Sequence, residues 1–330
     1  MAFKTFFMRE PNYHQALGAA WRLLWHNKII WILGLLSVFA GQFGLGDFAG
    51  RLMLWGDKVM ANQDFLDLKM YFQGWTNFND LTDLGLVLVG FIVLAILVGL
   101  VFVSVTAQGA LIAASADWYK KNRVDKLSQA WHESAGHFWR LFSINIGEKA
   151  ILCLMLLGLL ALWQFVPAGG GWLSTALSVI LSAVGFVVAF AAAAIAVYAS
   201  GYVIEDNYSL WRATASGFHL FFRHFSVSLE LGVILFIAGV VMLALIIAGS
   251  TLIMFLAALI WLIGAVSGLS SILWLGVAVY SALFMLLVIW LGSLFNAFAT
   301  GAWIYLFMQM KQTGLSSKVW GTLRRLFGRS

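Results

Sequence analysis

His132, Glu133 and His137 lie close together in the sequence and have side chains that could bind zinc. His132 and Glu133 are adjacent, and His137 follows His132 by five positions. A zinc protease places its two histidines four positions apart on a helix, so that one turn brings both rings to the same face. A spacing of five turns the second ring away from the first. We therefore interpret His132, Glu133 and His137 as residues on the polar face of an amphipathic helix.

No other stretch has the spacing of a catalytic motif. The chain contains no Gly-Xaa-Ser-Xaa-Gly, no glycine-rich phosphate loop with Lys, and no His-Glu-Xaa-Xaa-His. Its single cysteine, Cys153, lies in an apolar run, which excludes disulfides and cysteine-based metal sites. Six aspartates between Asp47 and Asp83 lack calcium-loop spacing, so we interpret this segment as a solvated cap. The sequence predicts no catalytic residue, no metal site and no cofactor.

Polar side chains inside long apolar runs are the second group of interest. A polar group in hydrocarbon is costly unless it is paired or faces water. Glu148, Lys149 and Glu230 lie near the ends of their runs, where long side chains can reach the interface. Gln108 and Asn296 lie within their runs, Asn296 the deeper of the two. Interhelical hydrogen bonding is the favoured interpretation of these residues, and a transport role is the alternative.

Three apolar runs end in the same signature, a polar residue followed by glycine and then isoleucine three positions later. The copies are Gln108-Gly109-Ala110-Leu111-Ile112, Ser200-Gly201-Tyr202-Val203-Ile204 and Thr300-Gly301-Ala302-Trp303-Ile304. Glycine lets neighbouring helices approach closely in a membrane. We expect the three glycines at equivalent levels near the cytoplasmic side, with the preceding polar side chains converging or hydrogen-bonding across helices. The candidate intramembrane positions are Gln108, Gly109, Ser200, Gly201, Glu230, Asn296, Thr300 and Gly301.

A second motif recurs in the same order, a small residue and an aromatic followed, after five residues, by Asn or His. It occurs at Ala20-Trp21…Asn27, Ala130-Trp131…His137 and Gly217-Phe218…His224. Small residues and aromatics are abundant, so coincidence is the alternative, but the matching order favours an internal repeat. We predict three units of one interfacial helix and two membrane helices, over approximately residues 12–116, 122–206 and 208–310, with a basic tail at 311–330.

The third interfacial segment, Leu210–Phe225, has two distinct faces. The residues of each face recur at helical spacing, as Arg212, Ser216, His219 and Arg223 on one side and Trp211, Phe218, Phe222 and Phe225 on the other. A helix with basic residues on its polar face and aromatics opposite lies flat in a membrane interface.

Composition indicates an integral membrane protein. Of 330 residues, 62% are hydrophobic and only 10% are charged, whereas a soluble domain carries about 25% charged residues. Two prolines and no low-complexity tract leave no obvious linker, so we predict a single membrane domain over residues 1–330. The net charge of +6 lies beside the apolar runs, which argues for a membrane address and against nucleic acid as a partner.

The apolar runs predict an all-α protein with six crossings. These runs are Ile29–Gly46, Leu84–Ala116, a run ending near Phe165, Trp172–Ile204, Val227–Ala248 and Ile272–Met310. Gly249–Ser271 is predicted to be re-entrant or interfacial, because its apolar part is too short to span. Under six crossings, 17 of the 20 Lys and Arg residues fall on one side. Both termini and the interfacial helices are therefore predicted to be cytoplasmic. Reading the first run as a signal peptide is disfavoured by the long, tryptophan-containing region before it.

The phrase YVIEDNYSLWRATASGFHLFFRHFSVSL, residues 202–229, follows an Ala- and Gly-rich run. Here the chain resembles the membrane domain of membrane-anchored glycerophosphoryl diester phosphodiesterases and related bacterial six-helix families of unknown function. The matching residues are Glu205-Asp206, Ala213, Gly217-Phe218 and Phe225. The resemblance implies a six-helix architecture and a bacterial cytoplasmic membrane. It does not imply phosphodiesterase activity, because no His is followed by Arg-Gly and no soluble segment is long enough for the family's catalytic barrel.

We expect a non-enzymatic membrane protein that organises or moves lipids or other amphiphiles, or that is the partner of a membrane complex. Its expected partners are membrane lipids and a membrane protein. A membrane-embedded lipid head-group hydrolase is the alternative. Clustered His, Asp and Glu near one interface would favour the hydrolase, but the histidines are spread over three segments and only Glu133 is a nearby carboxylate.

Overall fold

The computed structural model describes residues 13–38, 83–124, 127–163 and 172–312. Within these ranges the chain is helical and has no strand, so the predicted all-α class is confirmed. The helices are α1 (Tyr13–His26), α2 (Ile29–Ser37), α6 (Asp83–Lys121), α7 (Leu127–Gly136), α8 (Phe138–Trp163), α9 (Trp172–Asp206), α10 (Leu210–Arg223), α11 (Phe225–Ser267) and α12 (Ser270–Gln312). The predicted acidic cap before Asp83 and nearly all of the basic tail lie outside the described residues.

Five helices are long and apolar enough to cross a membrane. They cover Leu88–Lys121, Phe138–Ala161, Trp172–Asp206, Phe225–Ser267 and Ser270–Lys311. A helix that is apolar all round must be buried in protein or lipid, and helices can cross lipid because they satisfy their backbone groups internally. The chain is therefore an integral membrane protein with several membrane helices. The first predicted run is described only to Val38, so the sixth crossing stays a prediction.

The prediction that Gly249–Ser271 forms a separate re-entrant or interfacial piece is wrong. α11 continues without a break from Phe225 to Ser267, and the chain reverses at Gly268 before α12 begins. Gly268 has a φ of +70°, a left-handed conformation that glycine adopts readily at the end of a helix. The apolar stretch is too short to span alone, but it extends a helix that is 43 residues long, or about 64 Å.

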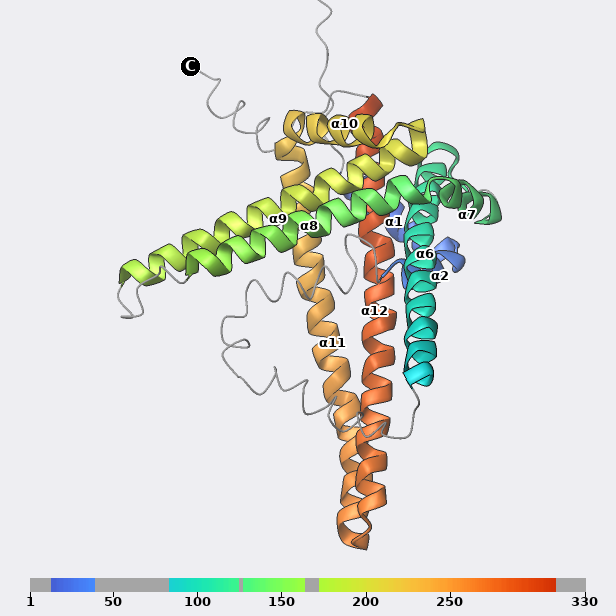
Figure 1. Ribbon diagram of the computed structural model, residues 1–330, viewed down its shortest axis with the longest axis vertical. Helices are drawn as coiled ribbons and strands as arrows, with labels where there is room; N and C mark the ends of the chain where they lie inside the picture. Colours follow the sequence, from blue (N-terminus) through green and yellow to red (C-terminus); the bar gives the residue numbers. More distant parts are fainter. Residues whose placement is uncertain (1–12, 39–82, 125–126, 164–171, 313–330) are drawn as a thin grey trace, which may run out of the picture.

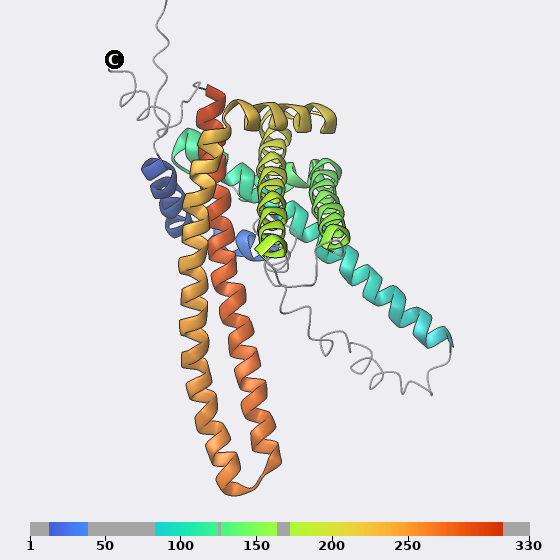
Figure 2. The same cartoon turned by 90° about the vertical axis from the view of Figure 1, so that its left-hand side faces the viewer.

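The inner ends of the long helices meet in one shared region, which we call the junction. From the junction the helices extend in different directions. α11 and α12 run side by side, and α8 and α9 form a second pair that crosses the first (Figure 1). Figure 2 shows the first half of α6 slanting away from both pairs. We call these three outlying parts the arms. Their side chains are largely exposed, as shown by Phe91 at 70% and Trp274 at 73%, so the arms present apolar surface for lipid.

Buried side chains concentrate at the junction. There the inner ends of α6, α9 and α12 pack together, and the large side chains that are almost fully buried include Leu111, Ile112, Tyr198, Trp303 and Ile304. The rings of Tyr198 and Trp303 lie edge to face with centroids 5.6 Å apart, a favoured aromatic geometry. The junction is therefore the part of the fold that is held by contacts between side chains.

Three short helices cover the junction, and each packs on a long helix from another predicted unit. α7 packs on α6, α10 on α9, and α1 on α12. α10 runs steeply inclined to the α11–α12 pair and extends from the inner end of α11 over α9 (Figures 1 and 2). A Cβ added at Gly217 of α10 would lie 3.0 Å from the backbone N of Ala199 and the backbone O of Ile195. At this point α10 rests directly on the backbone of α9.

Candidate functional site

The three signature glycines are buried, and each one faces a different neighbour. The nearest atoms to an added Cβ are Ser134 Oγ at 2.1 Å for Gly109, the Phe307 ring at 3.0 Å for Gly201, and Ala20 Cβ at 3.4 Å for Gly301. Gly109 is therefore the tightest of the three contacts, and Gly301 has room for a methyl group. Each glycine lets a side chain of another helix approach.

Gln108 and Asn296 make hydrogen bonds across helices. Asn145 of α8 donates from Nδ2 to Gln108 Oε1 over 2.8 Å. Asn296 Nδ2 donates to Ser37 Oγ at 2.8 Å and to Gly34 O at 3.2 Å, both in α2. Gln108 and Asn296 are buried, so these bonds satisfy groups that would be costly in hydrocarbon.

Ser200 and Thr300 are also buried. The Ser200 hydroxyl has no hydrogen-bond partner among the described residues, so the hydrogen bond expected from this signature is not formed. Glu230 accepts a hydrogen bond from the Tyr13 hydroxyl of α1. Burial, and then this hydrogen bond, raise the pKa of Tyr13, which keeps its hydroxyl protonated as the donor.

The residues first considered for zinc do not converge. His132 Nδ1 lies 2.9 Å from Ser128 O, and His137 Nδ1 lies 2.7 Å from Glu133 O, so each ring is held against its own stretch of chain. In the part of the chain that the structure describes, no group of three or more His, Cys, Asp and Glu side chains could hold a metal ion.

The acidic pair at the end of α9 ties this helix to two others. Glu205 forms an ion pair with Lys120 of α6. The Asp206 carboxylate accepts hydrogen bonds from Lys311 Nζ of α12 at 2.6 and 2.7 Å. Charge-assisted bonds of this kind are stronger than neutral ones, so Glu205 and Asp206 fix the inner ends of α6, α9 and α12 relative to one another.

Asn207 extends this link to α8 and to His137, which lies between α7 and α8. Its φ is 51°, in the left-handed region that Asn tolerates better than most residues. Asn207 Oδ1 accepts a hydrogen bond from Arg140 Nη1 at 2.5 Å and lies 3.0 Å from His137 Nε2. We call Glu205, Asp206 and Asn207 the clamp, because together they contact helices from all three predicted units.

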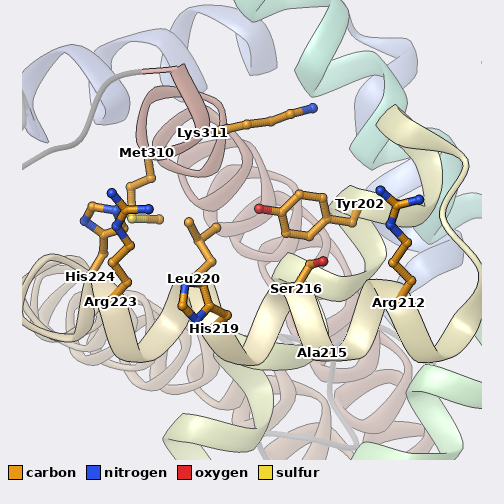
Figure 3. A pocket seen from close by; sticks show the side chains of 10 residues that line it. All are labelled: Tyr202, Arg212, Ala215, Ser216, His219, Leu220, Arg223, His224, Met310 and Lys311. Atoms are coloured by element: carbon orange, nitrogen blue, oxygen red, sulfur yellow. The ribbon is translucent and has the colours of Figure 1, made fainter.

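A pocket of about 410 Å³ opens beside the clamp, between α10 and the inner ends of α9 and α12 (Figure 3). Its lining includes the hydroxyls of Tyr202 and Ser216 and no acidic residue. The basic side chains that line it are Arg212, His219, Arg223, His224 and Lys311. We call this the basic pocket.

The positive charge of the basic pocket is only partly neutralised. Lys311 is paired with Asp206, whereas Arg212 and Arg223 have no carboxylate partner in the described ranges. The Arg212 guanidinium lies 4.1 Å from the centre of the Tyr208 ring, a cation–π contact that leaves its N–H donors available. Figure 3 shows the two arginines at opposite ends of the pocket, with the hydroxyls between them. Such a set of donors can bind an anion with several oxygens.

A scan against protein-family models gave no match, and comparisons with curated proteins and with solved structures gave none either. Function is therefore inferred from the junction, the clamp and the basic pocket.

Proposed function

We propose that this chain is a non-enzymatic protein of the bacterial cytoplasmic membrane that binds and organises lipids or other amphiphiles around its junction. The exposed aromatic surface at the junction carries the proposal. Trp211 of α10 is 85% exposed and Trp139 at the start of α8 is 74% exposed, and Trp21 and Trp25 of α1 are also exposed. Tryptophan gathers where hydrocarbon meets water, because its ring is apolar and its N–H is polar.

The three faces of α10 support an interfacial position. Ala213 and Gly217 are buried toward α9, Phe218 and Phe222 are exposed, and the arginines occupy the remaining face. α10 runs steeply inclined to the α11–α12 pair (Figures 1 and 2), as an interfacial helix does relative to membrane helices. Aromatics then reach the acyl chains while the basic face meets the headgroups.

The full topology belongs to this proposal. Six crossings with cytoplasmic termini account for the placement of 17 of the 20 Lys and Arg residues. The cyclic packing of α7 on α6, α10 on α9 and α1 on α12 supports three equivalent units. The proposed relation to the phosphodiesterase membrane domain rests on the matching residues in the sequence, which include the clamp pair Glu205-Asp206.

Thermal unfolding of purified protein in a neutral detergent tests the proposal. Added phospholipid should raise the melting temperature by several degrees, because a ligand of the folded state stabilises it. A variant with Trp211, Phe218 and Phe222 changed to Ser should lose most of this shift. Trp274→Ser, a change of another exposed aromatic residue on a distant arm, should keep it.

Two results would contradict the proposal. One is a melting temperature that no phospholipid changes. The other is enzymatic turnover, seen as release of glycerol phosphate from a glycerophosphodiester that stops in His132→Ala or Glu133→Ala.

A further inference from the structure

We propose that the basic pocket binds a phosphate group, and that this phosphate belongs to the headgroup of an anionic phospholipid. The choice of a lipid as the source rests on the proposed function, whereas the choice of phosphate rests on the pocket itself.

The donors of the pocket suit phosphate. Arg212 and Arg223 lie at opposite ends of the pocket, so one guanidinium at a time can match a pair of phosphate oxygens while the other adds positive charge, and Ser216 supplies a hydroxyl between them (Figure 3). No acidic side chain lines the pocket. A headgroup that also carries a quaternary ammonium would bring a cation against these basic side chains. The pocket should therefore prefer a headgroup with net negative charge over a zwitterionic one.

The neighbouring aromatic face favours a lipid over a free phosphate ion. Each basic residue of α10 directly follows an aromatic residue, in the pairs Trp211-Arg212, Phe218-His219 and Phe222-Arg223. Consecutive residues on a helix point about 100° apart, so the basic row and the exposed aromatic row lie side by side. A phospholipid can place its phosphate on one row and its acyl chains on the other, whereas a free ion gains only the first contact.

Asp206 gives the site an opposing charge. Its carboxylate neutralises Lys311 at 2.6 Å, at the edge of the pocket. Removing this negative charge while keeping a side chain of the same shape leaves Lys311 to attract the phosphate. Asp206→Asn should therefore tighten binding, in contrast to the loss of an arginine. Variants with opposite expected effects separate a direct electrostatic role from general damage to the fold.

The experiment is calorimetric titration of the full-length protein in a neutral detergent with a short-chain phosphatidic acid. In Arg212→Gln/Arg223→Gln the dissociation constant should rise at least about tenfold, because each basic side chain near an anionic headgroup contributes roughly fivefold in affinity. In Asp206→Asn it should fall by a factor of about 3 to 5. Arg22→Gln is the matched control, since this exposed arginine lies on α1 and donates to Gly18 O, and it should bind like the unchanged protein.

Two further ligands identify the source of the phosphate. Inorganic phosphate and short-chain phosphatidylcholine should each bind at least about tenfold more weakly than phosphatidic acid. Equal binding of inorganic phosphate would show that a free ion is the ligand, and equal binding of phosphatidylcholine would show that charge is not selected. Either result overturns the inference.

Failure of this inference differs from failure of the proposed function. If phosphatidic acid binds equally well to the double arginine variant, the pocket is not the site, although the protein still binds lipid. If the double variant does not fold, Asp206→Asn decides alone, and an unchanged or weaker affinity contradicts the inference. If no phospholipid of any headgroup binds, both proposals are wrong.

Discussion

At the scale of single residues, Gly217 shows how closely α10 approaches α9. In Gly217→Ala the new methyl group would lie 3.0 Å from backbone atoms of Ala199 and Ile195, which cannot rotate away. Overpacking of this kind costs about 1–3 kcal/mol, so the melting temperature in detergent should fall. Gly18→Ala is the control, because a Cβ there meets nothing within 4 Å and helix propensity improves by about 1 kcal/mol. A Gly217→Ala protein as stable as the control would contradict this contact.

The hydrogen bond between Asn296 and Ser37 allows a second prediction. Asn296→Ala and Ser37→Ala should each destabilise the junction, and the double variant should cost less than the two single changes combined. A coupling of about 0.6 kcal/mol, and at most about 1.7, is expected for a hydrogen bond between membrane helices. Thermal unfolding of all four proteins measures it, and strict additivity would show that the bond contributes nothing.

Sequence patterns could identify only some of the polar residues that hold the junction together or line the basic pocket. Asn296 stands out because Asn is rare in an apolar run, but its partner Ser37 lies 259 residues earlier, and no local spacing reveals that contact. The basic face of α10 follows from helical periodicity alone. Tyr202 and Lys311, which complete the pocket, come from the ends of two other helices, so their placement depends on how the helices pack.

At the scale of elements, the unbroken α11 can be tested by thiol labelling. In a Cys153→Ala background, a cysteine at Leu269 should react with a membrane-impermeant reagent, because it lies at the reversal between α11 and α12. A cysteine at Ser250 should not react, since it lies within the helix about 28 Å from Leu269. The six-crossing topology adds that a cysteine at Lys121 reacts only from the other side. Labelling of both Ser250 and Leu269 would restore the re-entrant arrangement.

The error over residues 249–271 has a physical cause. Glycine and serine flank a short apolar stretch, here Gly249-Ser250-Thr251 and Ser267-Gly268, and in water these residues end helices. In hydrocarbon every backbone group needs an internal partner, so the helix continues through Gly249-Ser250-Thr251. It ends only at Gly268, where the backbone takes a positive φ.

At the scale of the whole molecule, the contact of α1 with α12 joins the first and last described helices. A cysteine pair at Ala20 and Gly301, again with Cys153→Ala, should form a disulfide on mild oxidation. The ideal Cβ at Gly301 lies 3.4 Å from Ala20 Cβ, close to the separation found in disulfides. Protease fragments from the two ends should then stay joined until reduced. A pair at Gly18 and Gly301 is the control that should not cross-link.

Fold class and membrane character could be predicted from the sequence because they depend on local hydropathy and composition. The directions of the arms could not, because contacts between distant segments at the junction set them. Glu205 illustrates the difference, since its place at the end of an apolar run was visible, but its ion pair with Lys120, 85 residues earlier, required the structure.

The contact between α1 and α12 also has a consequence for the order of synthesis. A chain grows from its N-terminus at about 5–20 residues per second, so α1 emerges tens of seconds before the residues around Gly301 that cover it. During that interval the apolar face of α1, which includes Ala16, Ala20 and Leu23, lacks its main partner, because α12 is the helix it contacts most and α2 and α6 contact it less. The nascent protein must keep this face in lipid or against an insertion factor, and a chain truncated before α12 would keep it uncovered. α12, the last helix in the described part of the chain, therefore completes the packing around α1.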